Sequence, residues 1–321
     1  MPTVTTAARL HFGFQNLSLA HERLYGGVGL ALDEPRLTVE ATRADTVQCD
    51  DPATEPYVQR VVDVLDVPGA AVSVEERFPR HVGLGSGTQL SLATLIAVVR
   101  AYDRTADART YAPQLGRGGR SGVGVAAFES GGFIVDGGHP TERFTAEPPA
   151  EGDWDVPPVL AHHDVPAHWR FVIVIPDTDP GQSGSAEDQS MRQAVERADP
   201  GIADEISTLL TRRVLPAIAT RDHDDFGQAA ARLGRLNGAW YADEQGGVYR
   251  PPAGALVDSL ASAPVISGAG QSSWGPTVWG LTTADYESEA RDAGVLALDA
   301  ADVDGTIRVV APRNTGASLT E

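Results

Sequence analysis

A glycine-rich segment that runs directly into a long apolar stretch constrains the fold of this chain more than any other feature. The segment is His81-Val82-Gly83-Leu84-Gly85-Ser86-Gly87-Thr88-Gln89, and apolar residues then cover most of a helical surface from Thr88 to Tyr102. A helix that is apolar on nearly every side lies buried, so we expect this one at the centre of a domain. The segment itself predicts either a phosphate site at the start of that helix or a plain tight turn.

The composition of the segment shows how a phosphate would be held. Its glycines allow a backbone with positive φ and keep side chains out of the path of a ligand, so their amides can point inward, and Ser86 and Thr88 add hydroxyl donors. Two other phosphate motifs are excluded. A dinucleotide site has a different glycine spacing after the first strand, and a Walker loop requires a lysine that this chain lacks.

The charge balance narrows the partners of the protein. Its 321 residues include 44 acidic and 25 basic side chains, every basic one is Arg, and the formal net charge is −19. Such a surface repels polyanions, so we expect no nucleic-acid partner and no membrane partner. An acidic surface without lysine is typical of an extreme halophile, where salt screens the repulsion. A drift toward arginine in a GC-rich genome is the alternative.

One cysteine and the lack of long apolar windows set the expected compartment. Cys49 has no second cysteine with which to form an internal disulfide, which fits a reducing cytosol. The first residues contain no basic region followed by an apolar run, and no window has the length of a membrane span. We therefore expect a cytoplasmic protein.

Residue patterns before the glycine-rich segment predict two paired strands, a helix and a third strand. Apolar and polar residues alternate from Thr3 to Phe14 and from Val28 to Glu40, with Gly26-Gly27 between them as a turn signal. Helical spacing from Pro56 to Leu65 predicts a helix, and Ala71 to Glu76 returns to a strand pattern. The glycine-rich segment is thus expected between a strand and the buried helix.

The composition changes between Thr141 and Val156, where Pro, Glu, Asp and Gly prevail without periodicity. We place a domain boundary there, between residues 1–155 and residues 156–321. Strands and helices alternate irregularly on both sides, which predicts two α+β domains. The further elements expected are strands over Gly132 to Asp136, Trp169 to Ile175, Pro264 to Ser267, Pro276 to Leu281 and Thr306 to Ala311, and helices over Ser185 to Ala198, Ile202 to Ala219, Asp224 to Gly234 and Ala253 to Ala261.

Several sequence blocks keep one order from end to end of the chain. They are Arg9-Leu10-His11-Phe12-Gly13, Gly26-Gly27-Val28-Gly29-Leu30-Ala31-Leu32, Gly83-Leu84-Gly85-Ser86-Gly87-Thr88-Gln89-Leu90-Ser91-Leu92-Ala93, Gly116-Arg117-Gly118-Gly119-Arg120-Ser121-Gly122-Val123-Gly124, Gly132-Phe133-Ile134-Val135-Asp136-Gly137-Gly138-His139 and Gln271-Ser272-Ser273-Trp274-Gly275-Pro276-Thr277. In this order they resemble the GHMP small-molecule kinases and their relatives, and more narrowly the β-ribofuranosylaminobenzene 5′-phosphate synthase family.

That resemblance implies a fold and a reaction. The fold would be the GHMP-kinase fold, with two α/β-sandwich-like domains and the ligand site between them, and the protein would be a homodimer. The reaction would join phosphoribosyl pyrophosphate to a para-substituted benzoate, either 4-hydroxybenzoate or 4-aminobenzoate, and release CO2 and diphosphate, as a step toward a methanopterin-type one-carbon carrier. Mg²⁺ is expected with the departing diphosphate, and no organic cofactor is expected.

Two other functions stay open. GHMP kinases usually carry a second Ser where this chain has Gly87, and many use a Lys near the phosphoryl group. Phosphoryl transfer depends on cations around the spreading negative charge, so an ATP-dependent small-molecule kinase would have to use Arg here. The second alternative is a non-catalytic ligand-binding relative that has kept the fold.

Three residues are candidates for catalysis. Arg9 and His11 lie two positions apart on one strand, and therefore on one face, where they could hold a carboxylate or the 5′-phosphate. A surface Arg and a half-buried His on an edge strand is the alternative. Asp136 ends an apolar strand, where it could bind magnesium, position a proton or cap the next turn. We assign catalytic roles to Arg9, His11 and Asp136, and we assign no residue as a metal ligand.

Substrate contacts are expected from three loops. Arg117 and Arg120 flank glycines, and Arg prefers bidentate contact with phosphate, although solvated charge near a turn would look the same. Trp274 offers a flat surface to an aromatic ring, with a buried core Trp as the alternative. The full set is Gly83, Gly85, Ser86, Gly87, Thr88, Gln89, Arg117, Arg120, Ser272, Ser273 and Trp274.

Overall fold

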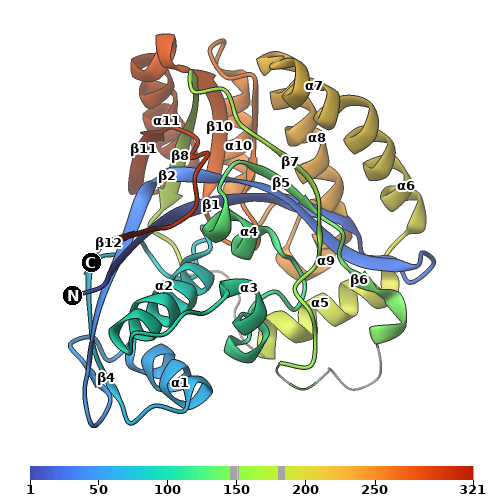
Figure 1. Cartoon of the computed structure of the whole chain (residues 1–321). Coiled ribbons are helices and arrows are strands. Elements are labelled where there is room, and N and C mark those ends of the chain that lie inside the picture. Colours follow the sequence, from blue (N-terminus) through green and yellow to red (C-terminus); the bar gives the residue numbers. More distant parts are fainter. Residues whose placement is uncertain (145–149, 151, 180–184, 321) are drawn as a thin grey trace.

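The computed structural model describes residues 1–144, 150, 152–179 and 185–320, which form two sheets with helices packed against them (Figure 1). In the larger sheet β12, β1, β2, β4 and β3 follow one another, β5 and β6 also pair with β2, and β7 pairs with β5. The smaller sheet has the order β11-β8-β10-β9. The strands of the larger sheet are β1 (Thr3–Asn16), β2 (Arg23–Arg43), β3 (Gln48–Cys49), β4 (Ala70–Glu76), β5 (Phe133–Asp136), β6 (His139–Pro140), β7 (Val159–His163) and β12 (Ser318–Thr320), and those of the smaller sheet are β8 (Trp169–Pro176), β9 (Gly268–Gln271), β10 (Val278–Thr283) and β11 (Gly305–Val310).

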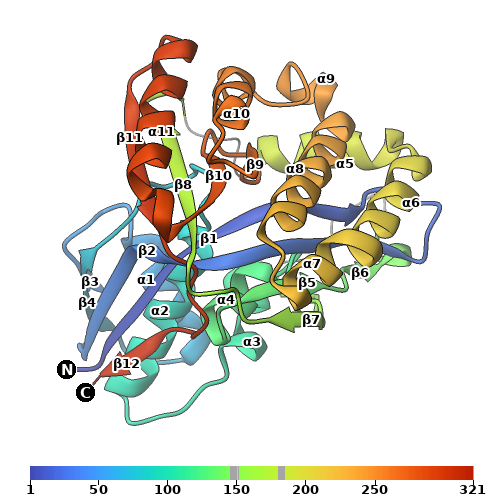
Figure 2. The same cartoon turned by 90° about the horizontal axis from the view of Figure 1, so that it is seen from above.

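The predicted α+β class is confirmed, and helices cover the larger sheet on both faces (Figures 1 and 2). On the larger sheet α2 and α4 lie against β1 and β2 on one face, and α6 and α8 lie against β1 on the other, whereas α10 and α11 pack against the smaller sheet. None of the helices in the described ranges has the length and apolar character that crossing a membrane requires. The helices are α1 (Glu55–Leu65), α2 (Ser86–Ala101), α3 (Ala108–Tyr111), α4 (Val123–Glu129), α5 (Ser185–Arg197), α6 (Pro200–Leu209), α7 (Leu215–Thr220), α8 (His223–Trp240), α9 (Ala242–Gln245), α10 (Ala253–Ser262) and α11 (Glu287–Ala301).

The predicted turn at Gly26-Gly27 is wrong, because both glycines lie inside β2 and the hairpin between β1 and β2 turns over residues 17–22. A Cβ atom on Gly27 would stand 2.1 Å from Ser121 Oγ and 2.9 Å from Asp136 Oδ2. The glycine is thus needed for the close approach of two side chains, a role that sequence alone does not separate from a turn.

The predicted central helix is confirmed as α2, which lies against β1 and β2 and beside α1 and α4. Its side chains are buried on every side, including Leu92, Leu95 and Val98. The helix begins at Ser86, two residues before the predicted start. This places the end of the glycine-rich segment inside the first helical turn.

One prediction in the second half is wrong, and one helix was missed. Residues Pro264 to Ser267 are not a strand, and β9 follows them at Gly268–Gln271, where a Cβ on Gly268 would lie 2.0 Å from Gly227 O. The sequence Gly-Ala-Gly-Gln has no β-branched residue to indicate a strand. Helix α11 was not predicted, because its buried stripe consists mainly of alanine and glycine.

The larger sheet also contains strands from beyond the domain boundary expected after residue 155. Strand β7 pairs with β5, and β12 pairs with β1, where Thr3 lies opposite Thr320.

The core joins the two sheets through aromatic rings around Phe226 of α8. Its ring lies 6.1 Å from Phe12 of β1, 5.5 Å from Phe133 of β5 and 5.1 Å from Trp169 of β8, measured between centroids. Phe12 also contacts Trp279 of β10, at 5.0 Å. These rings bury large apolar areas and fix α8 between the sheets.

One polar contact inside this core connects α8 to β1. The side chain of Asn237 accepts a hydrogen bond from Phe14 N at 2.6 Å and donates one to Phe14 O at 2.8 Å. The amide fits there because the neighbouring residue is Gly13, on which a Cβ would lie 2.4 Å from Asn237 Cγ. Asn237 is buried, so both backbone groups of Phe14 depend on it.

Replacing this amide tests how much the contact stabilises the fold. We expect Asn237→Ala to lower the free energy of unfolding by about 2–4 kcal/mol, since two buried backbone groups lose their partners. The control is Gln59→Ala, which removes an exposed amide that donates to Asp63 Oδ1 at 2.8 Å. Water replaces that bond, so its loss should be below about 1 kcal/mol. Urea unfolding of both variants makes the comparison, and equal losses would contradict it.

Candidate functional site

The glycine-rich segment turns into α2 through two residues with left-handed backbone. Gly83 has φ +91° and Gly85 has φ +82°, as expected, whereas Gly87 is helical. The backbone N–H groups of Ser86 and Gly87 precede the first intrahelical hydrogen bonds of α2. These free N–H groups lie at the helix N-terminus, which is the positive end of the helix dipole, so this turn can hold an anion such as phosphate.

The outer edge of β1 holds this segment in place. Arg9 N donates to Leu84 O at 3.0 Å, and two residues further His11 N donates to Ser272 Oγ at 3.1 Å. Ser272 Oγ in turn donates to Gly83 O at 2.7 Å, and Ser273 N donates to His11 O at 3.0 Å. The segments around residues 83 and 272 are therefore docked on one strand and on each other.

Two guanidinium groups flank the start of α2. Arg9 Nη1 donates to Gly83 O at 2.5 Å, and a Cβ on Gly85 would lie 3.0 Å from Arg9 Cγ. Arg117 Nε donates to Ser91 Oγ at 3.1 Å, and a Cβ on Gly87 would lie 3.2 Å from its Nη1. Both predicted residues thus stand beside the amides that an anion would use.

Asp136 is fully buried, and its two oxygens are surrounded by donors. Oδ2 accepts from Ser121 Oγ at 2.9 Å and Gly122 N at 2.7 Å, and Oδ1 accepts from Gly138 N at 2.9 Å. The backbone of Gly27 adds a fourth donor. Burial raises the pKa of the Asp136 carboxyl, and these hydrogen bonds oppose the rise.

These contacts connect the carboxylate to His11. Ser121 Oγ lies 3.2 Å from His11 Nε2, so Asp136, Ser121 and His11 form one chain of hydrogen bonds. Burial, and then the charge of Arg9, lowers the pKa of His11 to about 3. The imidazole is therefore neutral at neutral pH.

The metal role considered for Asp136 does not fit these contacts. A carboxylate that already accepts from four donors has little capacity for a cation. Within the described part of the chain, no group of three or more His, Cys, Asp and Glu side chains is placed to hold a metal ion. Magnesium at this site would have to rely on ligand oxygens.

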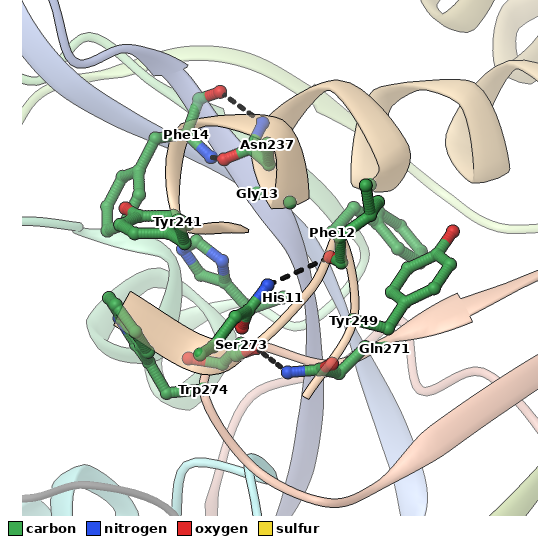
Figure 3. Close-up of a pocket in the computed structure, with 14 residues that line it drawn as sticks. His11, Phe12, Gly13, Phe14, Asn237, Tyr241, Tyr249, Gln271, Ser273 and Trp274 are labelled. Carbon is green, nitrogen blue, oxygen red and sulfur yellow. Dashed lines mark hydrogen bonds between the residues drawn. The ribbon is translucent and has the colours of Figure 1, made fainter. Parts of the chain in front are cut away.

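A hollow lies between β1, the end of α8 and the loop after β9 (Figure 3). The rings of Tyr241 and Trp274 line it with centroids 4.3 Å apart, and His11 and Phe14 lie beside them. Among the described lining residues there is no Asp, Glu or Arg. They are His11, Phe12, Gly13, Phe14, Gly234, Asn237, Gly238, Tyr241, Gln245, Val248, Tyr249, Gln271, Ser273 and Trp274.

A second hollow opens at the start of α2 and is lined by charged residues. Ser86 and Gly87 line it together with Arg77, Arg80 and Asp51. Its other lining residues are Leu37, Thr54, Tyr57, Val74, Phe78 and Leu90. The hydroxyl of Thr54 and the guanidinium of Arg77 donate to Asp51 and hold the pKa of its carboxyl below the usual range. The two hollows therefore differ in charge as well as position.

Of the predicted contacts, Ser86, Gly87, Ser273 and Trp274 line a hollow, and Gly83, Gly85, Arg117 and Ser272 lie behind them without lining either one. The other three, Gln89, Arg120 and Thr88, have contacts elsewhere. Gln89 is fully buried, and its amide accepts from Thr6 and donates to Gly124 O, which favours a structural role. Arg120 pairs with Asp188 of α5. Thr88 packs its methyl group near Gly124, where a Cβ would lie 3.2 Å from Thr88 Cγ2.

Sequence reasoning missed two groups at the site. Ser121, the middle of the hydrogen-bond chain, lies in a block that drew notice only for its glycines and arginines. Tyr241 and Asn237, which line the uncharged hollow, come from the end of α8, beyond the predicted helix end at Gly234. The helical pattern continues through Leu236 and Trp240, and that continuation is the signal that places Asn237 on α8 and Tyr241 directly after its last residue.

Comparison with known proteins connects this site to one family. Residues 56–132 match the family model described as GHMP kinases N terminal domain. The chain is 33% identical to the beta-ribofuranosylphenol 5′-phosphate synthase of Methanothermobacter thermautotrophicus over 98% of both chains, and 33% identical to that of Archaeoglobus fulgidus over 88% of both. The mevalonate kinase of Methanococcus jannaschii has the same fold, with a TM-score of 0.64 at 14% identity over 97% of this chain and 98% of that one.

A substitution at Gly85 tests the anion site. We expect Gly85→Ala to weaken the binding of inorganic diphosphate at least about tenfold. The backbone at residue 85 has φ +82°, which alanine adopts only with strain, and the new Cβ would displace Arg9. The matched control is Gly246→Ala, where φ is also +82° but the nearest neighbour of a Cβ is Pro251 at 3.9 Å. Calorimetric titration measures the affinity, and an equal loss in the control would refute the assignment.

The pKa of His139 gives a prediction about acid stability. Burial lowers this pKa from 6.5 to about 4, and Nε2 donates to Gly118 O at 3.1 Å. Between these two pH values the unfolded chain binds a proton that the native protein does not, so this contribution to stability is lost as the pH falls from 6.5 toward 4. We expect His139→Gln to show a shallower loss than the wild type in urea unfolding across this range. Parallel curves would contradict the assignment.

Proposed function

Because this chain belongs to the beta-ribofuranosylphenol 5′-phosphate synthase family, we propose that it joins phosphoribosyl pyrophosphate to 4-hydroxybenzoate and releases diphosphate and CO2. The observation that carries this proposal is the 33% identity over 98% of both chains. The name of these relatives describes a phenol, which favours 4-hydroxybenzoate over 4-aminobenzoate as the acceptor. The reaction is a pentosyl transfer.

The charges of the two hollows suggest where each substrate binds. The donor carries phosphate groups, and the start of α2 offers the amides of Ser86 and Gly87 next to Arg9 and Arg117. The charged hollow beside it adds Arg80. The uncharged hollow, with its aromatic rings, suits the benzoate ring.

The chemistry requires two bonds to break as one forms. The bond between ribose C1 and diphosphate breaks through an oxocarbenium-like state, and the leaving diphosphate takes the electron pair toward the amides at α2. The ring carbon that bears the carboxylate bonds to C1. Loss of CO2 then returns an electron pair to the ring, so that the product is an aryl riboside 5′-phosphate.

Mg²⁺ fits this scheme as part of the donor. No cluster of acidic and histidine side chains in the described ranges is placed to hold it, whereas diphosphate oxygens are ligands that Mg²⁺ accepts readily. The hydroxyl of Ser86 stands at the same helix start and can complete the shell. Magnesium would neutralise the charge of the leaving diphosphate.

Two contacts of Gly87 disfavour the kinase alternative. A side chain at this position would begin 3.2 Å from Arg117 Nη1 and 3.4 Å from the Tyr57 hydroxyl. A serine there, as in many GHMP kinases, would displace the guanidinium from the start of α2.

The homodimer, the salt tolerance and the cytoplasmic location stay predictions.

A single incubation tests the proposed function. The protein in molar KCl receives phosphoribosyl pyrophosphate, Mg²⁺ and carboxyl-labelled 4-hydroxybenzoate, and we expect equal amounts of labelled CO2 and diphosphate. Absence of both products would sink the proposal. A higher kcat/KM with 4-aminobenzoate would overturn the choice of acceptor. A melting shift with ATP but none with phosphoribosyl pyrophosphate would favour the kinase, and binding of both substrates without product would favour a non-catalytic relative.

A further inference from the structure

The uncharged hollow contains one side chain that is suited to exchange a proton with a ligand. His11 lines this hollow beside Phe14, Tyr241 and Trp274 (Figure 3). Tyrosine hydroxyls hold their protons at neutral pH, and the amide of Asn237 is used by Phe14. His11 is therefore the group to consider for acid–base chemistry in this hollow.

Its hydrogen bonds decide which nitrogen of His11 carries the proton. Three backbone N–H groups point at the oxygens of Asp136, which favours an ionised carboxylate that can only accept. Ser121 Oγ therefore donates its one hydrogen to Asp136, and it also accepts from Val123 N at 3.2 Å. Towards His11 Nε2, at 3.2 Å, the serine can then only accept.

This arrangement fixes the imidazole as the tautomer with its proton on Nε2. Nδ1 then carries a lone pair, and it makes no hydrogen bond with any residue in the described ranges. Any proton that reaches Nδ1 gives a cation whose Nε2–H points through Ser121 to the Asp136 carboxylate. The same chain of three groups thus orients the base and gives its charged form a partner, while burial and the charge of Arg9 oppose that form, so the proton stays on His11 only briefly.

We propose that His11 Nδ1 takes the proton of the para hydroxyl of the acceptor, with Ser121 and Asp136 as its positioning residues. This assignment rests on the proposed function. Removal of that proton drives the oxygen electron pair into the ring and makes the opposite carbon, which bears the carboxylate, nucleophilic. That carbon bonds to ribose C1 as diphosphate leaves with its electron pair. CO2 then departs, its bonding pair restores the aromatic ring, and the phenol oxygen recovers the proton from His11.

The lack of charge in the hollow supports the last step. None of its described lining residues is Asp, Glu or Arg, so the carboxylate of the acceptor meets no guanidinium within the lining, although the charge of Arg9 acts on His11. A carboxylate that is weakly solvated loses CO2 more readily than one held by arginine, because the charge disperses as the bond breaks. The hollow therefore favours loss of CO2 from the bound acceptor over tight binding of its carboxylate.

Fluorinated acceptors separate this role from a structural one. The hydroxyl of 3,5-difluoro-4-hydroxybenzoate is already ionised at neutral pH, so no base has to remove its proton. We expect Ser121→Ala to lower kcat about 100-fold with 4-hydroxybenzoate, while kcat with the fluorinated acceptor stays near that of the wild type. KM for phosphoribosyl pyrophosphate should not change. His11→Gln, which can still donate to Ser121 but binds no proton, should show the same selective loss.

Controls make each outcome decisive. Ser130→Ala, at the far end of α4, removes an exposed serine whose hydroxyl bonds only Ala126 O, and it should leave both acceptors unaffected. Urea unfolding checks that the variants fold, since Ser121 also accepts from Val123 N at the start of α4. Equal losses with both acceptors would overturn the role of His11 while leaving the proposed function standing. A wild type that releases no CO2 from either acceptor would overturn both.

Discussion

The outer edge of β1 is the constraint on which the site depends. After its short pairing with β12, this edge meets the glycine-rich segment at Arg9, the loop after β9 at His11 and the side chain of Asn237 at Phe14. Backbone groups of one strand therefore set the positions of three segments that are far apart in the sequence. Because Arg9 and His11 are on that strand, their side chains are placed relative to the same three segments.

Glycine makes a buried carboxylate possible behind this edge. The N–H groups of Gly122 and Gly138 reach Asp136 directly, and Gly27 leaves space for Ser121 on the other side. Burial without these donors would neutralise the carboxyl, and a neutral group could not hold Ser121 as a donor. The charge of Asp136 is thus kept by backbone groups, and it acts on the uncharged hollow only through Ser121 and His11.

Sequence reasoning predicted most of the fold because its signals were local. The apolar surface of α2 and the alternating residues of β1 are each decided within about fifteen residues, and both were confirmed. The roles of Gly27 and Ser121 depend on contacts between segments about 94 residues apart, which no local pattern contains. Arg9 and His11 were predicted to share a face, and the structure places both at the docked edge, but the tautomer of His11 followed only from its neighbours.

A docked edge made of backbone atoms has a consequence for how such a site diverges. The bonds from Arg9 N to Leu84 O and from Ser273 N to His11 O do not depend on which side chains these residues carry. Point mutations can therefore exchange the chemistry that faces a ligand while the frame persists. The fold shared with mevalonate kinase at 14% identity agrees with such a frame, which lets a lineage explore new substrates without first having to rebuild its scaffold.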